Sequence, residues 1–290
     1  MVKIWLGRLL NFSRSDIVKS NPHQRLRDAI IENTGDKSNV FIENIPKKWE
    51  KFSDVVLFNE GTFGGEVWKP FIGNDFWNDI AEALDVKRIG IKGEIRGRRR
   101  ESNVMMVLGD NDWVIRLENG VKFGYNFTKC MFSAGNINER RRMGEIVTNN
   151  EIVVDLYAGI GYYSLPILAN GLAKHVYCFD WNPTAIYALK RNIGINGIDG
   201  SRCSVIEGDN RITTNEYRNI ADRVILGLLP SSFGGFEAAL RVLKGNGGIL
   251  HIHGLGKSGS HLGWVTEVEH QLLDYDYKIN KKELIVIKSH

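Results

Sequence analysis

The sequence of 290 residues predicts an α/β protein, in which a parallel sheet covered by helices on both faces follows a smaller α+β domain. First, strand-like and helix-like segments alternate with short connections from about Glu145 onward. Second, a turn at Gly159 and Gly161 directly follows a hydrophobic strand-like run. Third, the Asn119-Gly120 pair separates two alternating segments, as in an antiparallel hairpin. We therefore expect an N-terminal extension over residues 1–40, the α+β domain over 41–144 and the parallel-sheet domain over 145–290.

The predicted elements before the glycine turn are short and of mixed type. Residues 23–33 have the pattern of a short helix, and residues 32–39 have the polar composition of a loop. The strand-like run "DVVLF" at 54–58 precedes "DFWNDIAEALDV" at 75–86, which has the apolar spacing of an amphipathic helix. Further strand-like segments are expected at 87–95, 103–109, 112–120 and 121–132.

The elements after about Glu145 form the repeating pattern of a doubly wound sheet. Helices are expected over "NPTAIYALKRNIGIN" at 182–196 and over "FGGFEAALRVL" at 233–243. In such sheets a ligand binds beyond the carboxyl ends of the strands, where the strand order reverses. The expected strands are 151–157, 175–180, 203–207, 222–228 and 247–253.

Composition excludes several classes of protein. No run of about 18 uncharged apolar residues is present, so we expect no transmembrane helix and no membrane association. The first residues lack an apolar signal sequence, so we expect a cytoplasmic protein; basic residues and serines before Asp16 leave a mitochondrial address as the alternative. Cys130, Cys178 and Cys203 are widely spaced, as buried thiols in a reducing compartment are. We expect a monomer.

Arginine is concentrated at two places although the net charge is only +4. One cluster contains Arg98, Arg99 and Arg100, and the other runs over residues 140–142. Most charge runs are solvated loops or helix faces. Two clusters before the glycine turn are also consistent with contacts to a nucleic-acid backbone.

Polar residues follow the predicted strands at the positions that a nucleotide-like ligand requires. The first strand ends in "DLYAGIG", which contains Asp155 and the two turn glycines. The second ends in Asp180, where an acid can accept both ribose hydroxyls. The third is followed by Asp209 and Asn210, which can meet the amine and ring nitrogen of an adenine. Each acid could instead cap the following helix.

The ligand that this pattern favours is S-adenosylmethionine rather than NAD. Ser164 follows the turn where the third glycine of a full dinucleotide fingerprint would stand. An acid after the third strand is also more typical of S-adenosylmethionine folds. We therefore expect residues 145–290 to form a Rossmann-like class I S-adenosylmethionine-dependent transferase domain.

Several motifs together resemble the tRNA wybutosine-synthesis aminocarboxypropyl transferase family, which is related to the tRNA guanine-37 N1-methyltransferases. They are "CMFSAGNINERRRM", "DLYAGIGYYSLPIL", "FDWNPTAIYALKRNIGING", "EGDNR", "ADRVILGLLPSS" and "GGILHIH". The resemblance covers about Ile45 to the C-terminus and implies transfer of the 3-amino-3-carboxypropyl group of S-adenosylmethionine to the tricyclic 4-demethylwyosine base of phenylalanine tRNA. The small-molecule product would be methylthioadenosine.

The resemblance also implies roles for individual residues. Ser133 and Arg140 would lie near the methionine part of the donor, Asp180 at its ribose, and Asp209 and Asn210 at its adenine. A guanidinium is independently a good bidentate partner for an amino-acid carboxylate. On the substrate side, the resemblance and the charge pattern favour residues 98–100 together with Leu229 and Pro230. No residue is assigned to proton removal from the base.

Two other functions remain open. The related N1-methyltransferases have an Asn-x-Pro at the end of the fourth strand, whereas this chain has Gly227, Leu228, Leu229 and Pro230 there, which favours aminocarboxypropyl transfer. An RNA-binding relative without turnover is the other alternative. Family members continue into a further strand after "ELIVIKSH", so we expect the final strand of the sheet to be missing, either because the product is shortened or because the strand is absent.

Two further patterns have simpler explanations. His251 and His253 lie two apart in a strand, but no third ligand has matching spacing, so we expect no metal site. Trp68, Trp77 and Trp113 could stack on tRNA bases, but they lie inside apolar patterns and are expected in the core.

Overall fold

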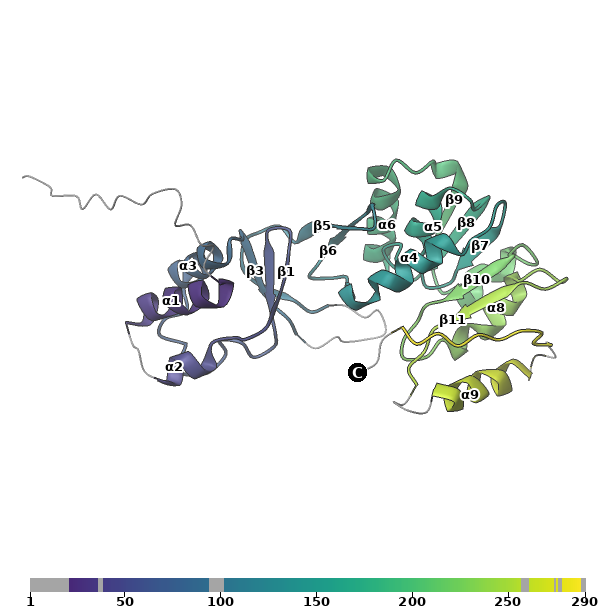
Figure 1. The fold of residues 1–290 in the computed structure, drawn as a ribbon. Helices are drawn as coiled ribbons and strands as arrows, with labels where there is room; N and C mark the ends of the chain where they lie inside the picture. Colours follow the sequence, from purple (N-terminus) through teal and green to yellow (C-terminus); the bar gives the residue numbers. More distant parts are fainter. Residues whose placement is uncertain are drawn as a thin grey trace, which may run out of the picture. The chain divides into compact units, whose positions relative to one another are not determined.

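The predicted α/β fold is confirmed by the computed structural model, in which two compact units are described separately (Figure 1). The first unit contains Met1–Lys92 and Met106–Gly109, and the second contains Gly93–Met105 and Asp110–His290. The structure describes residues 21–35, 39–93, 102–256, 261–273, 275 and 278–287.

The first unit is a four-stranded sheet with helices. Strand β2 pairs antiparallel with β1 and parallel with β3, and the strand order is β1-β2-β3-β4. Helix α1 begins after Asn21, whose side chain accepts a hydrogen bond from His23 N, and ends at Gly35 in the left-handed conformation. The elements are α1 (Pro22–Thr34), α2 (Asn39–Asn44), β1 (Trp49–Phe52), β2 (Val55–Phe58), α3 (Asn74–Leu84), β3 (Arg88–Ile91) and β4 (Met105–Leu108).

An aromatic cluster forms the core of this unit. The Phe63 ring makes edge contacts with four neighbouring rings, at centroid distances of 5.0 to 5.6 Å. Trp68 and Trp77 are two of those rings and are buried, so their predicted place in the core is confirmed. These side chains are not available to stack on RNA bases.

The predicted hairpin at Asn119-Gly120 is also confirmed, and it belongs to the second unit. Strands β5 (Trp113–Glu118) and β6 (Val121–Asn126) pair antiparallel around this turn, where both residues have positive φ. Asn192 of helix α6 (Pro183–Ile195) binds β6 through its side chain: its Oδ1 accepts from Gly124 N at 2.7 Å, and its Nδ2 donates to Gly124 O at 3.0 Å.

The two compact units therefore have different bounds from the ranges expected from the sequence, which placed a boundary at Gly144. Helix α4 (Ile137–Glu145) packs on α5 (Ser164–Asn170), where a Cβ on Gly144 would lie 3.0 Å from Pro166 O. Asn170 Nδ2 donates to Gly144 O at 2.8 Å. The hairpin and α4 precede the glycine turn in sequence but pack with the parallel sheet.

The main sheet contains five parallel strands in the order β11-β10-β7-β8-β9. All five predicted strands are present, and the order reverses between β7 and β10, as a doubly wound sheet requires. Helices α5 and α6 contact β8, and α8 contacts β10. The elements are β7 (Ile152–Asp155), β8 (His175–Asp180), β9 (Cys203–Glu207), α7 (Asn210–Thr213), β10 (Arg223–Leu226), α8 (Phe236–Val242), β11 (Ile249–Ile252) and α9 (His261–Leu273), with short 3₁₀ helices at Ala134–Asn136, Gly200–Arg202, Thr214–Glu216 and Phe233–Gly235.

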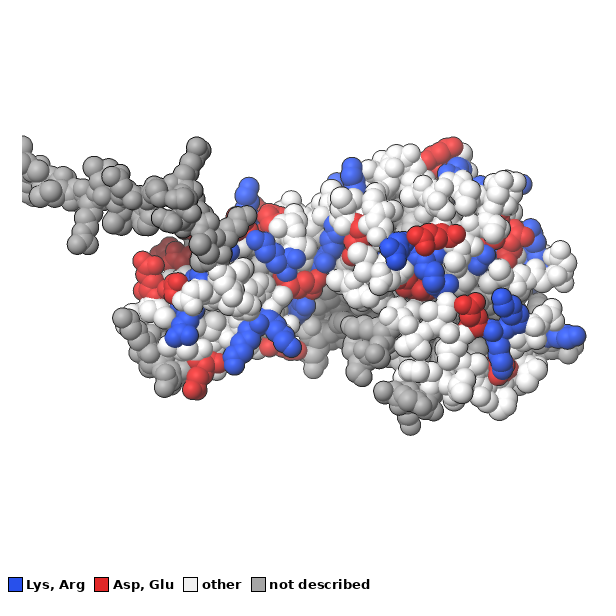
Figure 2. Space-filling view, viewed as in Figure 1, with Lys and Arg blue, Asp and Glu red and all other residues white. Residues whose placement is uncertain are grey.

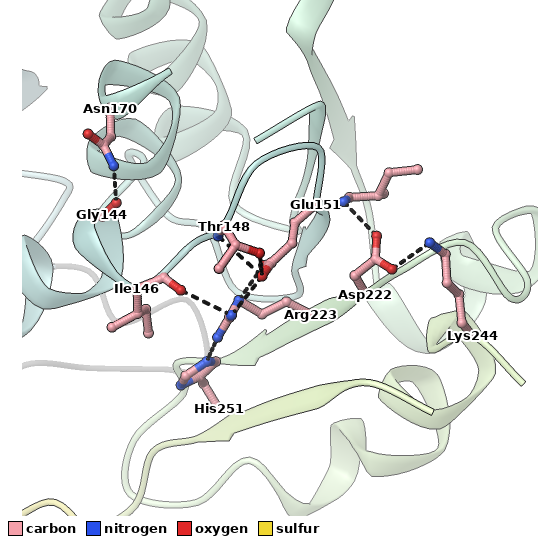
Figure 3. Close-up of polar contacts among 10 residues, drawn as sticks. Gly144, Ile146, Thr148, Glu151, Asn170, Asp222, Arg223, Lys244 and His251 are labelled. Carbon is pink, nitrogen blue, oxygen red and sulfur yellow. Dashed lines mark hydrogen bonds and ion pairs between the residues drawn. The ribbon is translucent and has the colours of Figure 1, made fainter. Parts of the chain in front are cut away.

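Ion pairs hold the amino-terminal edge of this sheet (Figure 3). Arg223 is 4% exposed and donates to both carboxylate oxygens of Glu151, at 2.7 and 3.0 Å. Its Nη1 lies 2.5 Å from His251 Nε2. Asp222 accepts from Ile152 N at 2.9 Å and from Lys244 at 2.5 Å. These contacts fix β7, β10 and β11 to one another and leave the carboxyl edge to form the site.

The part of the chain after α9 adds no strand to the sheet within the residues described. Residues 278–287 are described without helix or strand. None of the described helices has the length and apolar character to cross a membrane.

Candidate functional site

A cavity of about 1160 Å³ lies at the carboxyl ends of the parallel strands. Its lining includes eight of the residues predicted from the sequence: Ser133, Arg140, Gly159, Asp180, Asp209, Asn210, Leu229 and Pro230. Two other predicted residues, Asp155 and Gly161, are not among the lining residues and support the wall from behind. Arg98, Arg99 and Arg100 lie outside the described residues.

The glycine turn requires glycine at both positions. Gly159 has φ +55, and a Cβ there would lie 2.6 Å from the Tyr162 ring. Gly161 has φ +100, and a Cβ there would lie 2.5 Å from Leu165 Cγ. Larger residues would therefore meet both backbone strain and a clash. The bare backbone at Gly159 forms part of the cavity wall, as expected for close approach to a ligand.

Asp155 holds the start of this turn from a fully buried position. Its Oδ2 accepts from Ser164 Oγ at 2.8 Å, and its Oδ1 accepts from Tyr157 N at 3.3 Å. Burial raises the pKa of the Asp155 carboxyl to about 6, and the nearby Asp180 carboxylate acts in the same direction. Its side chain therefore orders the loop beneath the cavity.

Replacing Asp155 with Asn should change how stability depends on pH. The pKa rises from 3.8 in the unfolded chain to about 6 in the folded chain, so the folded chain binds the extra proton in this window. The free energy of unfolding of the wild type then falls as pH rises. Asn carries no titrating proton, so the variant should gain up to about 3 kcal/mol relative to wild type between about pH 4 and pH 7. Urea unfolding at both pH values tests this, and a pH-independent difference would contradict it.

Asp180 lies at the end of β8 and faces the cavity. Its Oδ2 accepts from Gly159 N at 2.8 Å, and its Oδ1 accepts from Asn182 N at 2.8 Å. Asn182, not Asp180, caps α6. Burial raises the pKa of the Asp180 carboxyl. Each carboxylate oxygen retains acceptor capacity beyond one hydrogen bond, so the group can also accept from a ligand's hydroxyls.

Asp209 and Asn210 are more engaged with the protein than the sequence suggested. Asp209 caps α7 by accepting from Arg211 N at 3.0 Å, and its carboxylate is paired with the Arg211 side chain. The hydrogen bond from Arg211 lowers the pKa of Asp209. Asn210 is buried and its Nδ2 donates to Leu156 O at 2.7 Å. Both still line the cavity, beside the end of β9.

Arg140 already has a carboxylate partner inside the protein. The side chain is 2% exposed, its Nε donates to Glu118 Oε2 at 2.8 Å, and its Nη1 donates to Ser133 O at 3.0 Å. Nη2 is 2.5 Å from the same Glu118 oxygen without an acceptable hydrogen-bond geometry. The guanidinium also lies over the Phe132 ring at 4.6 Å. Arg140 thus joins the hairpin to the segment that carries Ser133.

The other two arginines of this cluster are also paired with acids. Arg142 donates to both oxygens of Glu139, each at 2.7 Å, and Arg141 lies 3.8 Å from Glu145. Since each positive charge is matched locally, the cluster does not form an unpaired basic patch. This finding weakens its interpretation as a phosphate contact.

His253 and Glu139 form a second polar group at the cavity, and the sequence did not predict a role for either residue. His253 lines the cavity just beyond β11, and its ring stacks on Tyr163 at 4.9 Å. Its Nε2 lies 3.1 Å from Glu139 Oε1. Burial alone would raise the pKa of Glu139, but hydrogen bonds from Arg142 and His253 outweigh it and hold that pKa at about 2. The only sequence signal was "HIHG", which indicated a core or strand-end histidine.

The arrangement suits a nucleoside-like ligand and a second, flatter reactant. The lining combines the Asp180 carboxylate and the bare backbone at Gly159 with aromatic or apolar residues such as Tyr163, Leu229 and Pro230. The cavity volume of about 1160 Å³ is somewhat above the usual range for ligand pockets, about 300–1,000 Å³. The described residues contain no group of three or more His, Cys, Asp or Glu side chains placed to bind a metal ion.

Comparison with known proteins gives consistent matches. A family model described as "TRM5/TYW2 methyltransferase domain" matches residues 114–265. A tRNA wybutosine-synthesizing protein 2 homolog from Danio rerio is 47% identical over 212 residues, which cover 72% of this chain and 51% of that protein. A tRNA wybutosine-synthesizing protein 2/3/4 from Arabidopsis thaliana is 40% identical over 272 residues, or 92% of this chain and 27% of that protein.

A solved structure extends the similarity to three dimensions. The crystal structure of Pyrococcus horikoshii TYW2 in complex with MeSAdo has a TM-score of 0.71 and 27% identity, and the match covers 88% of each chain. This chain spans about half the length of the Danio rerio protein and about a quarter of the Arabidopsis thaliana protein.

Proposed function

Because the chain belongs to the TRM5/TYW2 methyltransferase domain family, as its motifs predicted, we propose that it is an S-adenosylmethionine-dependent tRNA aminocarboxypropyltransferase. It transfers the 3-amino-3-carboxypropyl group to the tricyclic 4-demethylwyosine base made from guanosine-37 of phenylalanine tRNA. The observation that carries this proposal is the cavity at the reversal of strand order, where the glycine turn and Asp180 lie together.

The described residues fit the donor. Gly159 presents bare backbone, and a side chain there would fill the cradle. The Asp180 carboxylate can accept hydrogen bonds from two ribose hydroxyls. Asp209 and Asn210 also line the cavity, and we expect the adenine to lie beside them. Leu229 and Pro230 also line the cavity, and we expect the target base to lie against them.

The chemistry depends on which carbon of the donor faces the base. A sulfonium activates all three attached carbons, so attack on the γ-carbon releases methylthioadenosine, whereas attack on the methyl carbon releases S-adenosylhomocysteine. The protein contributes mainly by placement, because the positive sulfur is already a good leaving group. Support for γ-carbon transfer comes from the named relatives, one of which was crystallised with MeSAdo, or methylthioadenosine.

The second candidate is N1-methylation of guanosine-37, which the family's name favours. Against it, the end of β10 continues as Gly227, Leu228, Leu229 and Pro230, without an amide side chain beside the target base. A Cβ on Gly227 would lie 2.9 Å from the Tyr163 ring, so this position holds no larger residue without rearrangement.

Phenylalanine tRNA as the partner is part of the proposal. Net charge alone provides little attraction, and Lys and Arg are interspersed with Asp and Glu on the face that Figure 2 shows. We therefore expect the enzyme to recognise the shape and the modification of the target nucleotide more than its charge. We also propose that the enzyme is monomeric and cytoplasmic.

Product analysis with two RNAs tests the proposal. The chain is incubated with S-adenosylmethionine and phenylalanine tRNA carrying either the tricyclic precursor or unmodified guanosine-37. Methylthioadenosine should form only with the precursor, and the base should gain an amino-acid side chain. S-adenosylhomocysteine and 1-methylguanosine from the unmodified RNA would favour the methyltransferase. Binding of both partners without either product would favour the RNA-binding relative.

A further inference from the structure

One ring nitrogen of His253 is buried at the cavity without a partner. The His253 side chain is 10% exposed, and its Nδ1 is shielded from solvent with no hydrogen bond among the described residues. A buried acceptor without a hydrogen-bond partner is energetically unfavourable. The same side chain lines the cavity, which places the ring beside the space that a reactant would occupy.

Glu139 sets which ring nitrogen of His253 carries the proton. The Glu139 side chain is 2% exposed, and its two oxygens receive hydrogen bonds from Arg142. The pKa of Glu139 is about 2, so near neutral pH it is a carboxylate that only accepts. Nε2 of His253, 3.1 Å away, must therefore donate the hydrogen. In the neutral ring Nδ1 then carries no hydrogen, and its lone pair can accept one. Stacking on Tyr163 holds the ring in place.

The proposed reaction requires a proton acceptor. A ring atom of the target base forms a bond to the donor's γ-carbon while the carbon–sulfur bond breaks, and sulfur keeps the electron pair as a neutral thioether. The base then carries a positive charge until the attacking atom loses its hydrogen. The same loss is needed if the methyl group moves instead.

We propose that His253 is the catalytic base of this transfer, with Glu139 as its positioning residue; this inference rests on the proposed function. Nδ1 takes the proton from the target base, and the resulting imidazolium is stabilised through Nε2 by the Glu139 carboxylate. The geometry is analogous to other sites in which a buried carboxylate orients a histidine base.

The charged groups around the ring favour this role on balance. Glu139 faces it from α4 and Asp155 from β7, and both stabilise the imidazolium. Arg142 opposes it but is neutralised by its own pair with Glu139. His251 lies two residues earlier, in β11, where burial and Arg223 lower its pKa to about 3, so it stays neutral.

The test compares His253→Gln with His251→Gln in single-turnover transfer across a range of pH. The control changes the same residue type two residues earlier, within β11. His251 contacts Arg223 (Figure 3) and is not among the residues that line the cavity. His253→Gln should slow transfer about 100-fold or more, the usual contribution of a general base, while donor affinity by calorimetry and melting temperature stay near wild type. Any dependence of the wild-type rate on pH that comes from this base should be absent in His253→Gln.

Rescue of the transfer rate by added imidazole distinguishes a loss of the base from a disturbed structure. Added imidazole should restore part of the rate to His253→Ala, whereas His251→Gln should keep a rate near wild type with or without imidazole. If the wild type transfers either group and His253→Gln keeps its rate and pH profile, His253 is not the base, although the proposed function stands. If His253→Gln is slow but keeps the wild-type pH dependence without rescue, the base role is also overturned. If the wild type forms neither product, the proposed function fails and this inference with it.

Discussion

Arg140→Met is expected to lower the free energy of unfolding by about 3–5 kcal/mol, the usual cost of removing one partner of a buried ion pair. Arg140 is 2% exposed and Glu118 is 11% exposed, so the variant leaves a carboxylate buried without its cation. It also loses the hydrogen bond to Ser133 O that ties the hairpin to the following segment. Urea unfolding of both proteins measures the difference.

The double variant Arg140→Met/Glu118→Met is the matched control. With no charge left uncompensated, it should recover most of the lost stability. A single variant as stable as wild type would contradict the buried-pair account.

The same variants test whether Arg140 also binds the donor's carboxylate. S-adenosylmethionine has that carboxylate and methylthioadenosine does not. If Arg140 binds it, the double variant should lose affinity for the first ligand only. Equal effects on both ligands would leave Arg140 with its structural role alone.

Asp180→Ala is expected to weaken S-adenosylmethionine binding by about 1–3 kcal/mol, because hydroxyl contacts to a charged acceptor are lost. The change also removes the acceptor for Gly159 N and Asn182 N, so the wall of the cavity loses its anchor. Calorimetry gives the affinity, and the melting temperature shows whether the variant is folded.

Asp180→Asn separates these two effects. Its remaining carbonyl oxygen can keep one backbone contact, whereas the negative charge is absent. Affinity between those of wild type and Asp180→Ala is expected. Unchanged donor affinity in a folded Asp180→Ala would remove Asp180 from the site.

The sheet and the part of the cavity around Gly159 and Asp180 could be predicted because their signals are local in sequence. Each strand is a short apolar run, and Asp180 directly follows β8. The turn at Gly159 and Gly161 needs positive φ, which few residues other than glycine adopt. The residues at and just after the end of a parallel strand lie at the carboxyl edge of the sheet. The positions of Asp180 and Gly159 relative to their strands were therefore enough to predict that the two residues lie close together.

The partners of the charged residues could not be predicted, because they come from distant parts of the chain. Glu139 and His253 are 114 residues apart, and nothing local to either indicates the other. Arg140 looked available for a ligand because its partner, Glu118, lies on the preceding hairpin. The hairpin's own place in the second unit depends on Asn192, which in sequence is an ordinary helix residue.

Isotope transfer tests the central claim most directly. The chain and precursor tRNA are incubated in parallel with S-adenosylmethionine labelled either in its methyl group or in its aminocarboxypropyl group, and the RNA is recovered. The aminocarboxypropyl label should appear in the RNA while the methyl label stays with methylthioadenosine. Methyl label in the RNA, with the other label left on S-adenosylhomocysteine, would contradict the account.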